Sequence, residues 1–181
     1  MEQLIHFSGI KNFLFTMKNN AGIKIGGTYS LVNYSKDYLK AFENSELYFF
    51  WDIIGNVYPG IQESHDYITK KYKKKLVNAL ALDIFHYIDN PWTHTLKGKR
   101  ILIVSPFIES IKEKEYIRKE IYGVDLFPDC KFVYIKPPQT QGINKSKEYY
   151  IELAIFINKI EKIKDSFDIA LCSVVDMVIW L

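Results

Sequence analysis

The chain has 181 residues, of which 48% are hydrophobic and 25% charged, and its formal net charge is +3. This length allows a single domain with a core, and the composition is ordinary for a globular protein. So small a net charge argues against a domain that reads DNA, because such domains usually carry a concentrated basic face. The two cysteines, Cys130 and Cys172, lack CxxC spacing. We expect them to be buried free thiols in a reducing compartment.

The first fifteen residues do not have the pattern of a signal peptide, because they lack both a basic start and a long apolar core. No uninterrupted apolar run approaches the ~20 residues that a membrane span needs. We therefore expect a cytoplasmic protein without a transmembrane segment.

Residues 1–89 are predicted to form a mixed α and β part. Residues 2–18 have helical spacing, Ile23–Ile25 suits a short strand before a Gly-Gly turn, and Ser35 is a candidate N-cap for the next helix. Residues 46–55 suit either a strand or a buried helical turn. A long helical pattern then runs from residue 63 to about residue 87, where Asn90-Pro91 ends it.

A dense basic cluster, KKYKKK at residues 70–75, lies within that long helical pattern. The simpler interpretation is a solvated helix face. The alternative is a contact with phosphate groups or with an anionic membrane.

Residues 90–181 show a clearer order of strand, helix, strand, helix and strand. The predicted strands are Ile101–Val104, Lys131–Ile135 and the run FDIALCSVV. The helix between the first two is expected to turn an inner face to the sheet that includes Tyr116, and Ser146 is a candidate N-cap for the second helix. Runs that are apolar on both faces are typical of a parallel sheet covered by helices. The predicted fold class is α/β, with a Rossmann-like, doubly wound and mostly parallel sheet, and the two parts are expected to form one compact domain.

Two loops should meet at the carboxyl edge of this sheet, where ligands bind in open α/β folds. The first is Ser105-Pro106-Phe107, and the second is KPPQTQG at residues 136–142. Gln139, Thr140 and Gln141 would offer hydrogen bonds to a sugar or a base. The loops could equally serve only as connections, because neither GxGxxG nor GxxxxGK[ST] is present.

Known catalytic motifs are absent from the sequence: there is no HExxH, no nucleophile elbow and no paired Cys/His metal spacing. The four histidines are scattered and are expected to be structural. Asp52 and Asp168 adjoin apolar runs, where burial would raise the pKa of a carboxyl group. Asp168 is expected to cap or begin its strand.

The sequence resembles a family of bacterial and large-DNA-virus proteins in three segments: NPWTHTLKGKRILIVSPFIESI, LFPDCKFVYIKPPQTQG and FDIALCS. These segments lie within residues 90–173. The family is that of GT-D-type glycosyltransferases, which are linked to capsule and surface-polysaccharide synthesis.

The resemblance implies a transferase that moves a sugar from a nucleotide-sugar donor to a glycan acceptor, in the cytoplasm of the bacterium or of the viral host. It implies a divalent metal, Mg²⁺ or Mn²⁺, that neutralises the diphosphate leaving group. It also implies the residues that line the donor cleft. These are Pro106, Phe107, Glu109 and Ser110 in the first motif and Gln139, Thr140 and Gly142 in the second, with Ser105 at the same edge.

Two departures from the family pattern bear on activity. An acidic motif is expected near the N-terminal glycine turn, but the segment IGGTYS places Gly27 and Tyr29 there, and neither can ligate Mg²⁺ through a carboxylate. After FDIALCS the family continues with a Gly-Gly-Tyr-Gly-like turn, whereas this chain reads VVDMVIWL. The codons required for Val174–Trp180, read from the third base of the first codon, permit Gly-Gly-Tyr-Gly-Asn-Leu.

From this we expect that a single-nucleotide frameshift truncates a longer protein just after Ser173, the alternative being a natural short C-terminus. Truncation would leave the sheet incomplete, its apolar surface uncovered and the chain prone to self-association. It would also leave the transferase weakly active or inactive. The alternatives are a non-catalytic module that binds nucleotides or glycans, and a small interaction protein that uses the lysine cluster.

Overall fold

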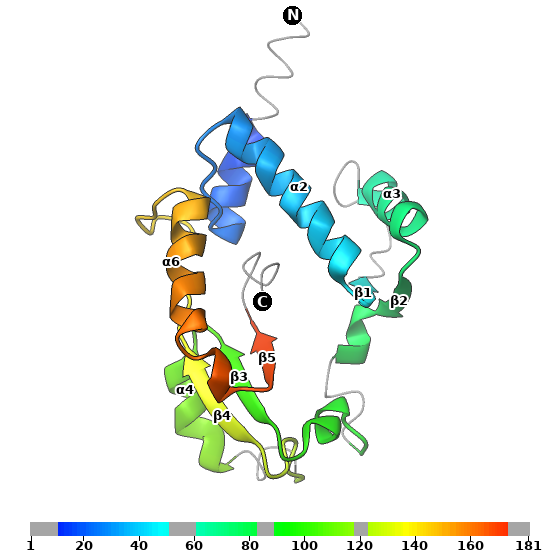
Figure 1. The fold of residues 1–181 in the computed structure, drawn as a ribbon, viewed down its shortest axis with the longest axis vertical. Helices are drawn as coiled ribbons and strands as arrows, with labels where there is room; N and C mark the ends of the chain where they lie inside the picture. Colours follow the sequence, from blue (N-terminus) through cyan, green and yellow to red (C-terminus); the bar gives the residue numbers. More distant parts are fainter. Residues whose placement is uncertain (1–10, 51–60, 83–88, 118–122, 174–181) are drawn as a thin grey trace, which may run out of the picture.

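The computed structural model describes residues 11–50, 61–82, 89–117 and 123–173 (Figure 1). Within these residues the fold is mixed α/β and contains two small sheets of parallel strands. Several predictions lie outside the described residues: the helical spacing of residues 2–10, the side chain of Asp52, the ends of two predicted helices at 83–87 and 118–122, and the C-terminal segment 174–181.

The larger sheet has three strands, β3 (Arg100–Val104), β4 (Lys131–Ile135) and β5 (Ile169–Cys172), in the order β4-β3-β5. Both pairings are parallel, and Leu102 lies opposite Val133 on one side and Ala170 on the other. The predicted set of three neighbouring parallel strands is therefore confirmed. Their carboxyl ends share one edge of the sheet.

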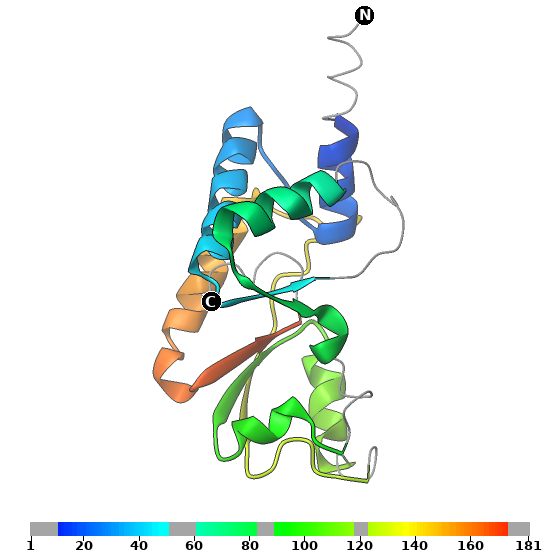
Figure 2. The ribbon, with the colours of Figure 1, turned by 90° about the vertical axis from the view of Figure 1, so that its right-hand side faces the viewer.

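Helices connect these strands and cover them. The chain passes from β3 to β4 through α4 (Ile108–Lys114) and η5 (Glu115–Ile117), and from β4 to β5 through α6 (Tyr149–Glu161) and η6 (Lys164–Ser166). Figure 2 shows α6 on one side of the strands and α4 on the other. Leu102 and Val104, both fully buried, pack against Phe156 and Ile160 of α6. The alternation of side chains along β3 sends these two residues to the same face.

Two details of these helices differ from the sequence prediction. The N-cap of α6 is Glu148 rather than Ser146, because the Glu148 carboxylate accepts a hydrogen bond from the Tyr150 amide at 3.0 Å. A carboxylate at this position also interacts favourably with the helix dipole. Tyr116, predicted to face inward, is 83% exposed, because α4 ends at Lys114 and a 3₁₀ turn redirects the chain.

The N-terminal part is helical where a strand was predicted. Residues 11–16 form an α-helix that continues into the π-helical turn η1 (Met17–Ala21). Ile23–Ile25 is an irregular segment that pairs with none of the described strands, so the predicted strand is wrong, although Ile23 is buried against α6. Helix α2 (Thr28–Asn44) begins seven residues before Ser35. The Ser35 hydroxyl therefore lies inside the helix, where it donates to the Leu31 carbonyl rather than capping an end.

The smaller sheet pairs β1 (Leu47–Phe50) with β2 (Lys75–Asn78) in parallel. Between them lies α3 (Ile61–Tyr72), and η2 (Ala79–Leu82) follows β2. The helix predicted from residue 63 is therefore confirmed as far as Tyr72, and its predicted continuation through β2 is wrong. Lys73 has φ 47°, a left-handed conformation that ends α3 and turns the chain into β2.

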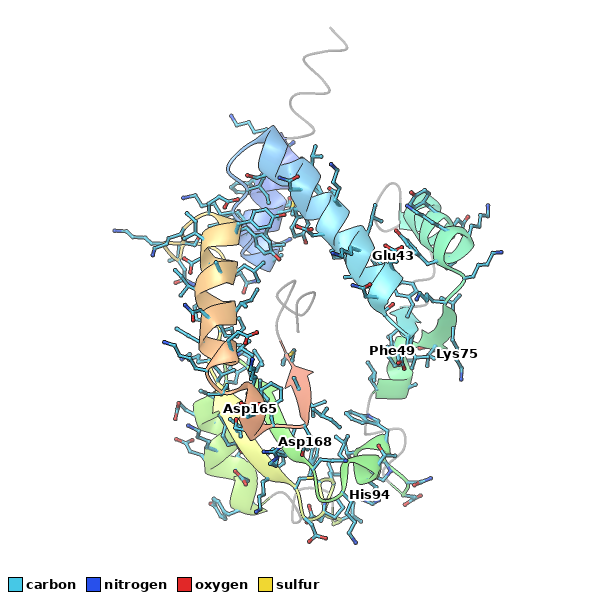
Figure 3. The ribbon with its side chains drawn as sticks, in the orientation of Figure 1. Glu43, Phe49, Lys75, His94, Asp165 and Asp168 are labelled. Carbon is cyan, nitrogen blue, oxygen red and sulfur yellow. The ribbon has the colours of Figure 1, made fainter. Side chains whose placement is uncertain are left out.

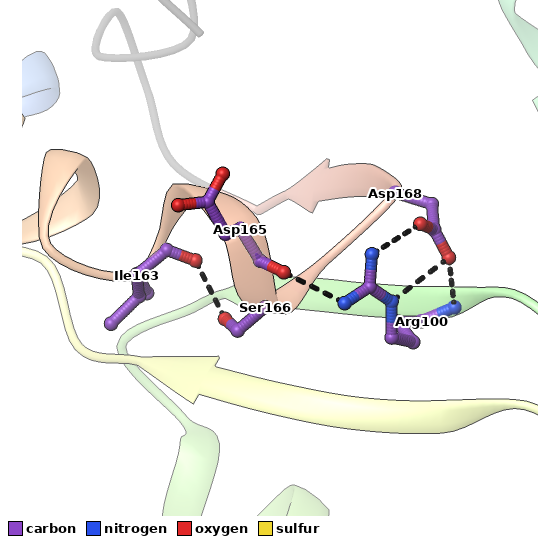
Figure 4. A network of polar contacts seen from close by, with 5 residues as sticks. All are labelled: Arg100, Ile163, Asp165, Ser166 and Asp168. Carbon is purple, nitrogen blue, oxygen red and sulfur yellow. Dashed lines mark hydrogen bonds and ion pairs between the residues drawn. The ribbon is translucent and has the colours of Figure 1, made fainter.

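An ion pair fixes the start of the larger sheet (Figure 4). The Asp168 carboxylate accepts from the Arg100 amide at 2.8 Å and from its guanidinium at 2.7 Å, and the guanidinium also donates to the Asp165 carbonyl. Hydrogen bonds from Arg100 lower the pKa of Asp168 to about 2, opposite to the predicted rise. The prediction failed because Asp168 is exposed and paired. Its expected position at the start of a strand is confirmed.

Candidate functional site

A cavity of about 290 Å³ lies at the carboxyl edge of the β4-β3-β5 sheet. It is bounded by the residues that follow the three strands, by the end of the N-terminal helical segment and by the first residue of α6. The lining residues are Asn20, Ala21, Gly22, Ile23, Pro106, Phe107, Pro137, Pro138, Gln139, Thr140, Gln141, Tyr149 and Ser173. The two loops predicted to share an edge are thus brought together.

The loop after β3 is held by Ser105, which is 2% exposed. Its amide donates to the Ile135 carbonyl at 3.4 Å, which continues the β3–β4 pairing by one residue. Its hydroxyl accepts from the Phe107 amide at 3.2 Å. This short turn places the Phe107 ring at the cavity with 68% of the residue exposed, so the ring is accessible to a ligand.

The loop after β4 is tied to the N-terminal part by Lys18. The Lys18 ammonium donates to the carbonyl oxygens of Thr140, of Gly142 at 3.3 Å and of Asn144 at 3.2 Å. The side-chain amide of Gln141 donates to the Asn20 carbonyl at 2.8 Å. These contacts link segments more than 100 residues apart, and they determine where Gln139 and Thr140 lie.

Gly22 allows the closest approach between these segments. It has φ 75°, and a Cβ built on it would lie 2.4 Å from Thr140 Oγ1 and 2.9 Å from the Gln141 amide nitrogen. Its amide donates to the Lys18 carbonyl, closing η1. A left-handed turn with no room for a side chain requires glycine.

Tyr149 forms the wall on the α6 side and is 4% exposed. Its amide donates to the Lys24 carbonyl at 2.9 Å, and its ring packs edge-to-face against Tyr34 with centroids 5.2 Å apart. The neighbouring Tyr150 hydroxyl donates to Asp37 at 2.6 Å, and burial together with this carboxylate raises the pKa of Tyr150. The start of α6 is thereby fixed to α2.

The predicted site residues divide into two groups. Pro106, Phe107, Gln139 and Thr140 line the cavity, and Ser105 is buried at the base of the same loop. The remaining three are not among the lining residues. Glu109 and Ser110 are exposed on α4, and Gly142 lies one residue beyond the lining, in a left-handed turn with φ 63°.

Sequence reasoning missed the N-terminal wall of the cavity and Tyr149. The available signal was Gly22, which follows a helical pattern and precedes an apolar residue, as a left-handed C-cap glycine does. Nothing in the sequence pattern indicated that this turn lies against residues 139–141.

Among the described residues, the lining contains no acidic and no basic side chain. Nor does any cluster of three or more His, Cys, Asp or Glu residues suited to a metal ion occur in the described part of the chain. The oxygen ligands that Mg²⁺ or Mn²⁺ prefers are chiefly carboxylates. The described residues around this cavity therefore do not fit the divalent metal that the resemblance implies.

Charged side chains outside the cavity lie on several of the described elements; Glu43, Lys75 and Asp165 are among those marked in Figure 3. No helix in the described ranges has both the length and the apolar character needed to cross a bilayer. Cys130 and Cys172 are free and partly buried, and burial raises the pKa of the Cys172 thiol to about 11.

A scan against protein-family models and searches of curated proteins and of solved structures found no match to this chain. The functional interpretation depends on the geometry of the cavity and on the motifs that flank it.

Proposed function

We propose that the chain is a glycosyltransferase-like protein of surface-polysaccharide synthesis and that the cavity binds the nucleotide-sugar donor. The observation that carries the proposal is the place of the cavity. It lies beyond the carboxyl ends of three parallel strands, with β3 in the middle and its two successors on opposite sides. In doubly wound sheets such a reversal of strand order marks the ligand crevice. On this proposal the three strands belong to a Rossmann-like sheet.

The chemistry of the lining suits the neutral parts of such a donor. Gln139 and Thr140 offer amide and hydroxyl groups to sugar hydroxyls or to the edge of a base, and the exposed Phe107 ring offers an aromatic face. A diphosphate would find no cationic side chain among the described lining residues. The cavity is therefore proposed to hold the base or the sugar, with the diphosphate at its open side in water.

The test is a calorimetric titration of the full chain with a panel of UDP- and GDP-sugars, comparing wild type with Phe107→Ala. We expect at least one donor to bind and the variant to lose about tenfold in affinity, since one aromatic stacking contact contributes about 0.5–1.5 kcal/mol beyond area burial. Tyr116→Ala is the matched control, because Tyr116 is also an exposed aromatic and lies outside the lining. If Phe107→Ala and Tyr116→Ala bind the donor equally well, Phe107 does not contact it. If none of the donors binds the wild-type chain, the proposal is contradicted.

A second candidate is a module that binds a nucleotide or a glycan without transferring the sugar. The lining without a carboxylate favours it, because it offers neither a metal ligand nor a general base among the described residues. The same titration with and without Mn²⁺ separates the candidates, together with an assay for nucleoside diphosphate released from the donor. Release that depends on Mn²⁺ supports the transferase, whereas binding that is unchanged by Mn²⁺ and yields no release supports the module.

A further inference from the structure

Five lysines lie close together where α3 ends and β2 begins. Lys70 and Lys71 are in the last turn of α3, Lys73 and Lys74 form the turn, and Lys75 is the first residue of β2. Four of them are exposed and Lys74 is partly so. Within the described residues none of the five ammonium groups forms an ion pair with a carboxylate; Lys74 instead donates to the Glu43 carbonyl at 2.8 Å. We call this surface the lysine face.

Aromatic rings lie directly beneath part of the lysine face. The Lys71 ammonium is 5.3 Å from the centre of the Tyr67 ring and 5.2 Å from that of Tyr72. It also donates to the Tyr67 hydroxyl at 3.1 Å. Tyr67 is 51% exposed, and Tyr72 stacks on Phe42 of α2. A tyrosine with an apolar body and a polar tip is favoured at the boundary between lipid and water.

Exposed leucines follow the lysine face along the chain, in β2 and η2. Leu76, Leu80 and Leu82 are 41%, 46% and 47% exposed. A groove of about 360 Å³ adjoins them on the α2–β1 side, and its lining includes Phe42, Leu47 and Tyr48. Exposed lysines and exposed leucines thus occur on elements that are consecutive in the chain.

We propose that the lysine face docks on an anionic lipid surface. Charge complementarity favours this partner: the exposed lysines, which have no carboxylate partner among the described residues, attract anionic headgroups, while the leucines that follow them and Tyr67 can enter the boundary between headgroups and acyl chains. A nucleic acid would use the lysines but would leave the leucines in water, so the lipid surface fits more of the observed features.

The docking surface and the cavity lie in different parts of the fold. The sheet β1–β2 and helix α3 lie across the molecule from α6, whose first residue borders the cavity (Figure 1). Figure 3 shows Lys75 on that outer side. A chain bound to lipid through the lysine face would therefore keep the cavity accessible, and the inference does not depend on what the cavity binds.

The test is co-sedimentation of the full chain with lipid vesicles, either pure phosphatidylcholine or a mixture with 30% phosphatidylserine (a chosen test composition). We expect binding to the mixed vesicles only, weakening as salt rises. The triple variant Lys70→Gln, Lys73→Gln, Lys75→Gln should lower the partition coefficient on the order of 100-fold, since each lysine near such a surface contributes about fivefold.

The matched control is Lys145→Gln, Lys159→Gln, Lys162→Gln, which removes the same charge from exposed lysines elsewhere. If the partition coefficient of this control falls as far as that of the triple variant, net charge alone determines vesicle binding and the proposal is overturned. Leu80→Ser with Leu82→Ser should weaken vesicle binding without changing its salt dependence. A further outcome would also contradict the proposal: the chain binds neither kind of vesicle but binds a single-stranded RNA, and the triple variant loses that binding. The partner of the lysine face would then be a nucleic acid.

Discussion

Gly22 is where the N-terminal helical segment meets the loop after β4, and its replacement by alanine tests that contact. Two costs are expected in Gly22→Ala. A left-handed conformation costs an L-residue about 1–2 kcal/mol. The added Cβ would lie 2.4 Å from Thr140 Oγ1 and 2.9 Å from the Gln141 nitrogen, and overpacking of this kind costs about 1–3 kcal/mol. The sum is a loss of about 2–5 kcal/mol in the free energy of unfolding.

Gly98→Ala isolates the first cost. Gly98 has nearly the same backbone angle, φ 74°, but a Cβ built there meets nothing within 4 Å. The stabilising effect of alanine on the unfolded chain is common to both variants and cancels. Urea unfolding followed by circular dichroism should therefore show Gly22→Ala less stable than Gly98→Ala by about 1–3 kcal/mol.

A second comparison identifies the crowded atom. Thr140→Ala removes Oγ1, so in the Gly22→Ala background it should restore part of the lost stability, with a coupling of at least about 0.5 kcal/mol. If the free energies of unfolding of Gly22→Ala and Gly98→Ala differ by less than about 0.5 kcal/mol, the close approach between Gly22 and Thr140 is refuted. The inference that the N-terminal segment forms a wall of the cavity would then fail as well.

Three further predictions concern the sheet and its surroundings. Hydrogen bonds from Arg100 lower the pKa of Asp168 to about 2 in the folded chain, whereas the pKa of the same carboxyl group is about 3.8 in the unfolded chain. The ion pair therefore stabilises the fold above about pH 4, and this contribution disappears as the pH falls from about 4 to about 2. Urea midpoints measured across that range should fall less steeply for Asp168→Asn than for wild type, and identical slopes would count against the pairing. Phe156→Ala empties a site that is 1% exposed, so the free energy of unfolding should drop by about 3–5 kcal/mol in the same assay, and a loss below about 1 kcal/mol would mean that α6 does not cover the sheet. The thiol pKa of about 11 at Cys172 predicts slow alkylation by iodoacetamide at pH 8 in a Cys130→Ser background, rising with pH and with urea; fast labelling of the folded chain would contradict its burial.

The larger sheet could be predicted from the sequence because its signals are local and consistent. Ile101–Val104 and Lys131–Ile135 are short β-branched or aromatic runs that end in proline-containing loops. The alternation of strands with helical segments predicts parallel pairing, and parallel pairing brings Phe107 and Gln139 to one edge. The site loops follow from this topology without knowledge of any side-chain contact.

The N-terminal part could not be predicted in the same way. Ile23–Ile25 has the residues of a strand, but packing against α6 holds it as an irregular segment, and its burial depends on tertiary contact. The break after Tyr72 depends on one left-handed lysine, Lys73, inside an otherwise helical pattern. The contact between Gly22 and Thr140 joins residues far apart in the chain, and no periodic pattern encodes such a contact.

Hydrogen exchange measured by mass spectrometry, with and without a bound nucleotide sugar, tests the central claim most directly. The account predicts slower amide exchange on donor addition in three segments: residues 20–23, 105–107 and 139–141, which surround the cavity. The β1–β2 sheet should be unaffected. Donor binding that protects other segments and leaves these three unchanged would contradict a donor site at the carboxyl edge of the β4-β3-β5 sheet.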